Sequence, residues 1–167
     1  DFIIQASARF LGEGTDPHRK TGLMIRSGLH PDAAHVSCVV HGDGLTSLQY
    51  RPEAGSETLE VRMDIRGPGV LQLEKKGNTF TMSVAHSGEL YSREEIEIPL
   101  SGELFAGIFI CSHNGSVSEE ALFWNVRVFG TAPDELVPYS EYIGSLLEVM
   151  DVETGRRQVL DGDTGSW

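Results

Sequence analysis

LQLEKKGNTFTMSVAHS, residues 71–87, contains two runs in which apolar and polar side chains alternate, separated by the turn Lys76-Gly77-Asn78. Because side chains alternate between the two faces of a strand, this pattern predicts a β-hairpin with one buried face and one face in water. The apolar members of the two runs are Leu71, Leu73, Phe80, Met82 and Val84.

The same alternation recurs from Phe2 to Phe129, and hairpin-type turns such as Gly42-Asp43-Gly44 and Gly67-Pro68-Gly69 separate the runs. Short strands at regular spacing predict an all-β protein, an antiparallel β-sandwich or barrel. The run around 104–111 is apolar on both faces, which favours a central position in its sheet. The expected strands are 2–10, 22–27, 35–42, 47–51, 57–65, 70–76, 79–86, 95–100, 104–113 and 121–129.

Length and charge limit the classes of partner. The 167 residues carry a net charge of −12, which disfavours nucleic acid and anionic membrane surfaces. No apolar run approaches the roughly 20 residues that cross a bilayer, so no membrane insertion is expected. Neutral ligands such as sugars, and partner proteins, remain open. The chain starts at Asp1-Phe2 already in strand pattern, as a trimmed or processed chain would, and its compartment stays unassigned.

A change in composition at residues 130–133 divides the chain. Residues 1–130 form the expected sandwich, residues 131–143 a polar linker containing Pro133, and residues 144–167 a β-hairpin around Glu153-Thr154-Gly155. Because one hairpin cannot bury its own face, it either packs on the sandwich or belongs to a further domain.

Several segments, taken together, resemble the concanavalin A-like lectin/glucanase superfamily, and within it the jelly-roll sandwiches that accompany bacterial glycoside hydrolases. The resemblance covers about residues 1–130 and implies a jelly-roll sandwich with lectin or glucanase relatives. The segments that carry it are TGLMIRS (21–27), GDGLTSLQYR (42–51), LQLEKKGNTFTMSV (71–84), FAGIFICSHN (105–114) and ALFWNVRV (121–128).

The tail LLEVMDVETGRRQVL, residues 146–160, resembles the first strand pair of a TolB-like propeller blade. The resemblance implies a larger bacterial protein in which the sandwich is fused to a propeller. The favoured function is therefore a non-catalytic module that binds carbohydrate or the companion propeller domain. A glycoside hydrolase-like enzyme and a purely structural domain are the alternatives.

Polar side chains on three expected strands are candidates for ligand binding. Arg26, Gln49 and Arg51 alternate away from the apolar positions of their strands, and His41 ends the strand between them. If these strands adjoin, one face gathers guanidinium, amide and imidazole groups, which suit hydroxyl pairs or a carboxylate. The favoured interpretation is that these side chains pair with Glu60, Asp64 or Glu74 on a wet surface, and ligand binding is the alternative.

Two further candidates lie elsewhere in the sequence. His113 follows the apolar run GIFICS at the point where a strand becomes a loop, and it is either a ligand contact or an ordinary turn residue. In ALFWNVRVF, Phe123 and Trp124 point to opposite faces. The family pattern favours Phe123 for the core, which leaves Trp124 as a candidate stacking surface for a sugar ring.

The weak catalytic candidates are Glu60 and Asp64. Laminarinase-type enzymes on this fold use Glu-x-Asp-x-Glu or a variant with one more residue, so that carboxylates on one strand face act as acid and nucleophile. Here the second Glu is missing, and Arg62 lies between the two acids. The pattern therefore favours a solvated, ion-paired strand face and puts hydrolase activity in doubt.

No metal or cofactor is expected. The six histidines show no ligand-pair spacing, and Asp161-Gly162-Asp163 has the start of a calcium loop without its later Glu. Cys38 and Cys111 each lie in an apolar run, where a thiol acts as a small hydrophobe. A disulfide between them is the alternative, should their strands be neighbours.

Overall fold

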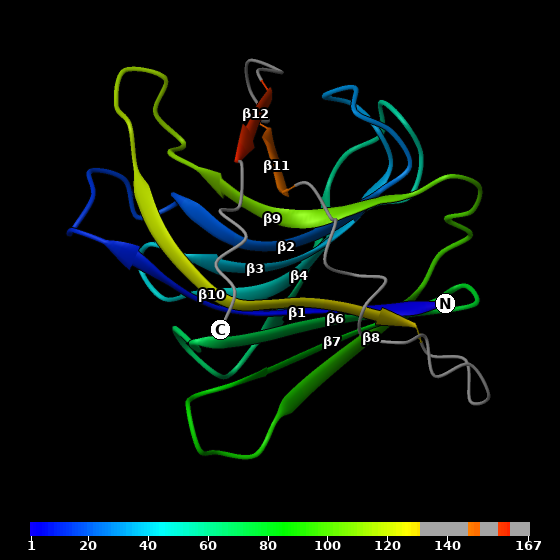
Figure 1. Cartoon of the computed structure of the whole chain (residues 1–167), viewed down its shortest axis with the longest axis horizontal. Coiled ribbons are helices and arrows are strands. Elements are labelled where there is room, and N and C mark those ends of the chain that lie inside the picture. Colours follow the sequence, from blue (N-terminus) through cyan, green and yellow to red (C-terminus); the bar gives the residue numbers. More distant parts are fainter. Residues whose placement is uncertain (131–146, 151–156, 161–167) are drawn as a thin grey trace, which may run out of the picture.

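A computed structural model describes residues 1–130, 147–150 and 157–160. It is a β-sandwich of two five-stranded antiparallel sheets packed face to face, with no helix in the described residues (Figure 1). The predicted fold class, an all-β antiparallel sandwich, is confirmed.

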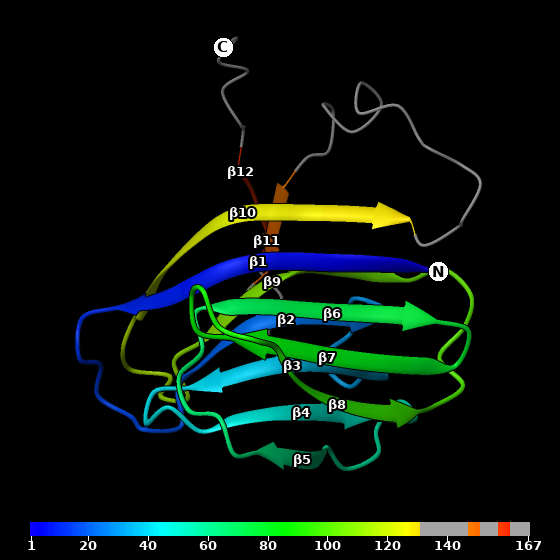
Figure 2. The same cartoon turned by 90° about the horizontal axis from the view of Figure 1, so that it is seen from below.

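Sheet A has the strand order β10-β1-β6-β7-β8, and this order can be followed in Figure 2. Its central strands carry the alternation from which the fold was predicted. The bounds are β1 Phe2–Leu11, β6 Val70–Lys76, β7 Thr79–Ala85, β8 Ser92–Glu97 and β10 Glu120–Gly130.

Sheet B has the order β5-β4-β3-β2-β9, so its first four strands form a meander and β9 returns from the other sheet to pair with β2. The strands bend so that both ends of the sheet rise away from sheet A, as β9 shows in Figure 1. The bounds are β2 Lys20–Arg26, β3 His35–His41, β4 Thr46–Arg51, β5 Leu59–Met63 and β9 Phe105–Cys111.

The hairpin predicted at residues 71–87 is β6 and β7. Leu73 pairs with Met82, and the chain reverses between Lys76 and Thr79. Gly77 adopts φ 58°, a left-handed conformation that suits glycine in a tight turn. The predicted hairpin, including the position of its turn, is confirmed.

The core lies between the two sheets and draws one side chain in two from each strand. Leu23 of β2 pairs with Cys38 of β3, which pairs with Leu48 of β4, and all three are fully buried. Phe80 and Met82 of sheet A are equally buried, and Phe123 packs against the same cluster as expected. Each large side chain buried in this way contributes about 1.5–3 kcal/mol of transfer free energy.

Two strands differ from expectation. β9 is an edge strand of sheet B, so its predicted central position is wrong. Its outward face carries the apolar side chain of Phe109, which covers Gly22 on β2. A Cβ added to Gly22 would lie 3.3 Å from the Phe109 ring. β8 ends at Glu97 rather than Leu100, since Pro99 lacks the N–H that a ladder needs.

β10 has a bulge opposite Ala6, because Gln5 pairs with Arg127 whereas Ser7 pairs with Trp124. Asn125 takes up the extra residue at φ 54°, a conformation that asparagine tolerates better than most residues.

The tail contributes one strand pair, β11 (Leu147–Met150) and β12 (Arg157–Leu160), antiparallel as predicted for a hairpin. The proposed linker 131–143 and the Asp161-Gly162-Asp163 segment lie outside the described residues. The division into domains therefore stays a prediction. Within the described ranges no helix has the length and apolar character to cross a membrane.

We predict that Gly22→Ala destabilises the sandwich strongly whereas Gly107→Ala does not. A Cβ on Gly22 would lie 1.9 Å from the Cys38 carbonyl oxygen, so the backbone of β3 would have to move. Gly107 lies on the neighbouring strand β9 and faces the same side of sheet B as Gly22. A Cβ on Gly107 would meet no described atom within 4 Å. Thermal unfolding should show that Gly22→Ala lowers the free energy of unfolding by about 2–3 kcal/mol. Equal melting temperatures for the two variants would contradict this packing.

Candidate functional site

The side of sheet B that faces away from the core gathers most of the candidate residues. Strand alternation places them there, because their neighbours in sequence point into the core. We call this side the polar face and define it by ten outward side chains of β2–β5. They are Lys20, Arg26, His35, Ser37, His41, Ser47, Gln49, Arg51, Glu60 and Arg62.

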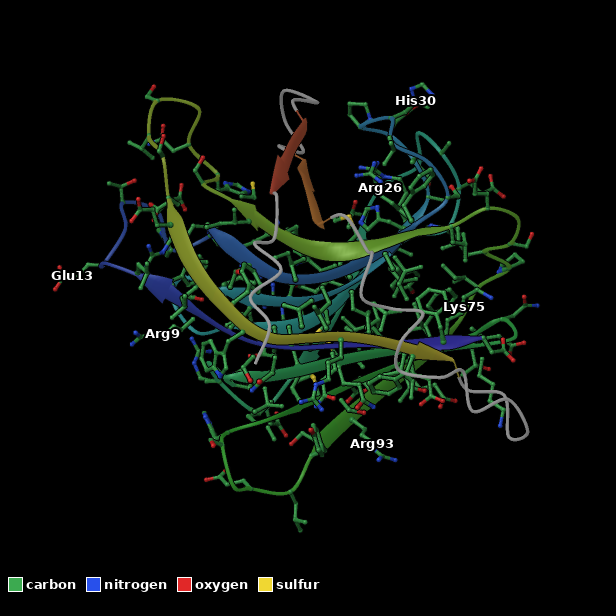
Figure 3. All side chains as sticks on the ribbon, viewed as in Figure 1. Arg9, Glu13, Arg26, His30, Lys75 and Arg93 are labelled. Atoms are coloured by element: carbon green, nitrogen blue, oxygen red, sulfur yellow. The ribbon has the colours of Figure 1, made fainter. Side chains whose placement is uncertain are left out.

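Two arginines and a histidine form a row across one end of the polar face. Arg26 pairs with His35 in the register of β2 and β3, and His35 pairs with Arg51 of β4. Arg26 donates to the carbonyl oxygens of Gly28, at 2.6 Å, and His30. Figure 3 shows Arg26 beside His30 at this end of the molecule.

Arg51 fixes the same 27–34 loop from the other side. Its Nη1 donates to the Pro31 carbonyl oxygen at 2.9 Å, and its Nη2 lies 3.4 Å from the Thr58 hydroxyl. Both arginines therefore use part of their hydrogen-bonding capacity to hold a loop. Neither arginine forms the expected ion pair with Glu60, Asp64 or Glu74, whereas Gln49 does bond to Glu60.

The centre of the polar face is a hydrogen-bonded group around Gln49. Gln49 Nε2 donates to Glu60 Oε1 at 2.9 Å and lies 3.1 Å from His41 Nε2. Arg62 Nε donates to Glu60 Oε2 at 2.7 Å. Glu60 thus has the ion-paired surroundings that the sequence favoured, with its cation two residues along the same strand.

Three histidines meet at the other end of the face. The ring of His18, in the loop before β2, is 6.1 Å from that of His41 and 5.7 Å from that of His113. His113 Nδ1 lies 4.0 Å from Asp16 Oδ2, and its φ of 58° marks it as a turn residue. The interpretation of His113 as a turn residue is confirmed, and its role as a ligand contact stays a prediction.

A buried ion pair holds the loops at this end together. Arg19 pairs with Glu119, and both side chains are almost fully buried. Arg19 also donates to the Gly12 carbonyl oxygen at 2.9 Å and stacks 4.2 Å above the Phe10 ring. The Arg19 hydrogen bond holds the pKa of Glu119 below its usual value. The loops before β2 and before β10 are therefore fixed to each other beside His18 and His113.

The polar face keeps its histidines neutral. Burial, together with the nearby charges of Arg51 and Arg26, lowers the pKa of His35 to about 4 against the opposing effect of a hydrogen bond to the Ala33 carbonyl oxygen. Burial and the Lys20 charge also lower the pKa of His41, although Glu60 and Asp43 oppose them. At neutral pH both imidazoles are therefore uncharged, and each has one donor and one acceptor nitrogen.

The two catalytic candidates do not form a pair. Burial raises the pKa of Glu60, but hydrogen bonds from Arg62, Gln49 and Ser47 outweigh it and bring the pKa to about 2. Such a carboxyl has no proton to donate at neutral pH. Asp64 lies exposed just beyond the end of β5. Glycoside hydrolysis by the usual route needs a protonated acid opposite a second carboxylate, and these two residues do not supply it.

Trp124 is separated from the other candidates. It lies on β10 of sheet A, 41% exposed and paired with Ser7 on the outward side of that sheet. The cysteines are also apart, because β2 separates β3 from β9. Cys38 is a free, fully buried thiol whose pKa burial raises.

Sequence reasoning missed five members of this site, namely His18, Lys20, His35, Ser37 and Ser47. His35, Ser37 and His41 are separated by even numbers of residues in β3, so their side chains point to the same face. The alternation that identified His41 therefore identifies His35 and Ser37 as well. His18 lies in an irregular loop, and only the fold brings it to His41. Among the described residues no group of three or more His, Cys, Asp or Glu is arranged to hold a metal ion.

Comparison of the chain with protein-family models, with curated proteins and with solved structures finds no match.

We predict that acidification destabilises the protein through His35. Its pKa is about 4 when folded and 6.5 when unfolded, so its contribution is complete above pH 6.5. That contribution is lost as pH falls from 6.5 to 4, by up to about 3 kcal/mol. Urea unfolding at pH 7, 5.5 and 4 should show a shallower pH dependence for His35→Gln than for the natural protein. Identical slopes would show that His35 protonates freely in the folded state.

Proposed function

We propose that this chain is a non-catalytic carbohydrate-binding module and that the polar face of sheet B is its ligand surface. The observation that supports it most is the set of amide, guanidinium, imidazole and hydroxyl groups on one side of one bent sheet, where Met24 and Val39 are the apolar members on β2 and β3. Such groups form the paired donors and acceptors that recognise sugar hydroxyls. The sandwich around them holds each side chain at a fixed strand position, so the surface is formed before the ligand arrives.

The resemblance of residues 1–130 to concanavalin A-like jelly rolls agrees with this proposal, since sandwiches of this kind accompany glycoside hydrolases. In the proposed larger protein, the tail begins a TolB-like propeller and the sandwich brings that propeller to a glycan. The polar face supplies recognition but no chemistry, because Glu60 is held ionised and Asp64 lies beyond the strand.

A second candidate, a structural domain that docks on the companion propeller, is favoured by β10. This edge strand exposes several large apolar side chains, which is unusual for a strand in water. They are Leu122, Trp124, Val126, Val128 and Phe129. Under this candidate the binding surface is β10 on sheet A, and changes on the polar face of sheet B leave the interaction intact.

We predict that a glycan array detects binding by the natural protein and that Gln49→Ala abolishes or strongly weakens it. Gln49 links His41 to Glu60 at the centre of the polar face, so its loss removes a donor and leaves Glu60 Oε1 without the Gln49 hydrogen bond. The matched control is Gln72→Ala, because Gln72 lies on the opposite sheet and pairs with Gln5 and Ser83. This control should bind as the natural protein does.

Three results would separate the candidates. Absence of binding to every sugar at millimolar concentration excludes the carbohydrate proposal. Equal losses in Gln49→Ala and Gln72→Ala place the ligand elsewhere. Polysaccharide hydrolysis that disappears in Glu60→Gln would establish the enzyme alternative instead.

A further inference from the structure

The charge on the polar face is opposite to that of the chain as a whole. Its outward strand positions include four cations, Lys20, Arg26, Arg51 and Arg62, and one carboxylate, Glu60. Most of the acidic residues in the described part of the chain lie elsewhere. β8 of sheet A alone carries three of them, Glu94, Glu95 and Glu97.

The positive charges of Arg26 and Arg51 are not neutralised by a carboxylate. Both guanidinium groups donate to backbone carbonyl oxygens, which are neutral acceptors. Among the described residues no ion pair within 4.0 Å includes either arginine. Asp32 is close enough to oppose the lowering of the Arg26 pKa, but burial and the Arg51 charge dominate. The arginine end of the face therefore keeps a positive potential.

The same face contains unused hydrogen-bonding atoms. In the described part of the chain, four buried side-chain polar atoms lack a partner, and three of them belong to the polar face. They are Ser37 Oγ, His41 Nδ1 and Arg51 Nε. Ser37 is 1% exposed and His41 5% exposed. Native proteins rarely leave such atoms unsatisfied, so their concentration on one face points to a ligand that supplies the partners.

The hydrogen-bonding character of these atoms indicates what the ligand offers. Arg51 Nε carries a hydrogen and can only donate, and a serine hydroxyl that has no acceptor is free to donate. Donors beside two uncompensated cations are suited to oxygen acceptors that carry negative charge. At physiological ionic strength charges interact over about 8 Å, so these neighbours dominate over acids on the far sheet.

We infer that the polar face binds an acidic carbohydrate, a sugar chain with carboxylate or sulfate groups, whose anionic oxygens accept hydrogen bonds from Ser37 and Arg51. This inference rests on the proposed function, of which it specifies the ligand class. An acidic sugar fits better than other polyanions, because the centre of the face around Gln49 offers the mixed donors and acceptors that hydroxyl groups need.

The test measures calorimetric affinity for pairs of oligosaccharides that differ only in charge. The first pair is tetragalacturonate and its methyl ester, and the second is a sulfated galactose tetramer and its unsulfated form. We expect at least one charged member to bind about ten-fold or more tightly than its neutral counterpart, since hydrogen bonds to charged groups are the stronger ones. That preference should fall at 0.5 M salt. The pair that discriminates shows whether the ligand group is carboxylate or sulfate.

Variants assign the binding to the named atoms. Ser37→Ala removes a buried hydroxyl that makes no hydrogen bond in the free protein, so its melting temperature should stay equal or rise. Its affinity for the acidic sugar should fall about five-fold or more. Ser83→Ala is the matched control, because Ser83 is similarly buried but lies on sheet A. Arg51→Gln tests the positive charge in the same way, and its control is Arg93→Gln, because Arg93 lies on β8 of sheet A, far from Arg26 in Figure 3.

Each contrary result has a distinct meaning. Equal or tighter binding of the neutral members overturns the acidic-ligand inference and leaves the proposed function standing. If none of the four sugars binds but neutral glycans on the array do, the acidic-ligand inference is again overturned and the proposed function stands. Absence of binding to any sugar overturns both. Equal binding to vesicles of anionic phospholipid, lost in Ser37→Ala, would replace the sugar by a membrane surface.

Discussion

The register between β2, β3 and β4 is the constraint on which both the core and the polar face depend. In one row of this register Leu23, Cys38 and Leu48 fill the interior. Three residues along the strands, Arg26, His35 and Arg51 form another row, which lies on the outside. Because strand alternation has a period of two, a slip of β3 by one residue would bring His35 and Ser37 into the core. Burial of the apolar side chains of β2, β3 and β4 therefore fixes the position of every polar group on the outward face of the same strands.

The same constraint explains how much the sequence predicts. The hairpin of β6 and β7 is clear in the sequence because alternation and a Gly77 turn agree with each other. Arg26, Gln49 and Arg51 were placed on one face by parity alone, and they lie there. Parity does not reveal strand order, however. β9 is apolar on both sides because Phe109 covers Gly22, and no local pattern distinguishes that arrangement from a central strand.

Tertiary contacts account for the rest of the difference. The carbonyl groups that hold Arg26 and Arg51 come from the 27–34 loop, whose path depends on the whole sheet. His18 reaches His41 because Lys20 pairs with His41 in the register of β2 and β3, and the Arg19–Glu119 pair joins this end to the loop before β10. Trp124 was a reasonable binding aromatic by residue type, but the fold places it on the other sheet. Residue type and parity thus identify candidates, and topology selects those that act together.

The chemistry of the face follows from its partial burial. Low solvation keeps His35 and His41 neutral, so they serve as hydrogen-bonding groups rather than charges. Three donors hold Glu60 ionised, so it serves as an acceptor and not as a proton donor. What remains unused is a set of donors and positive charge beside Ser37 and Arg51. Under the proposed function these donors hold an oxygen-rich ligand, and Glu60 is the one carboxylate among the ten described side chains of the polar face.

The central claim, that the polar face of sheet B is the ligand surface, is tested most directly by an NMR titration of the isotope-labelled protein with an oligosaccharide that binds it. The account predicts that the largest amide shifts occur on β3 and β4, at Ser37, Gln49 and Arg51, and that β10 is unaffected. Shifts concentrated at Trp124 and its neighbours on β10, with β3 and β4 unchanged, would contradict it.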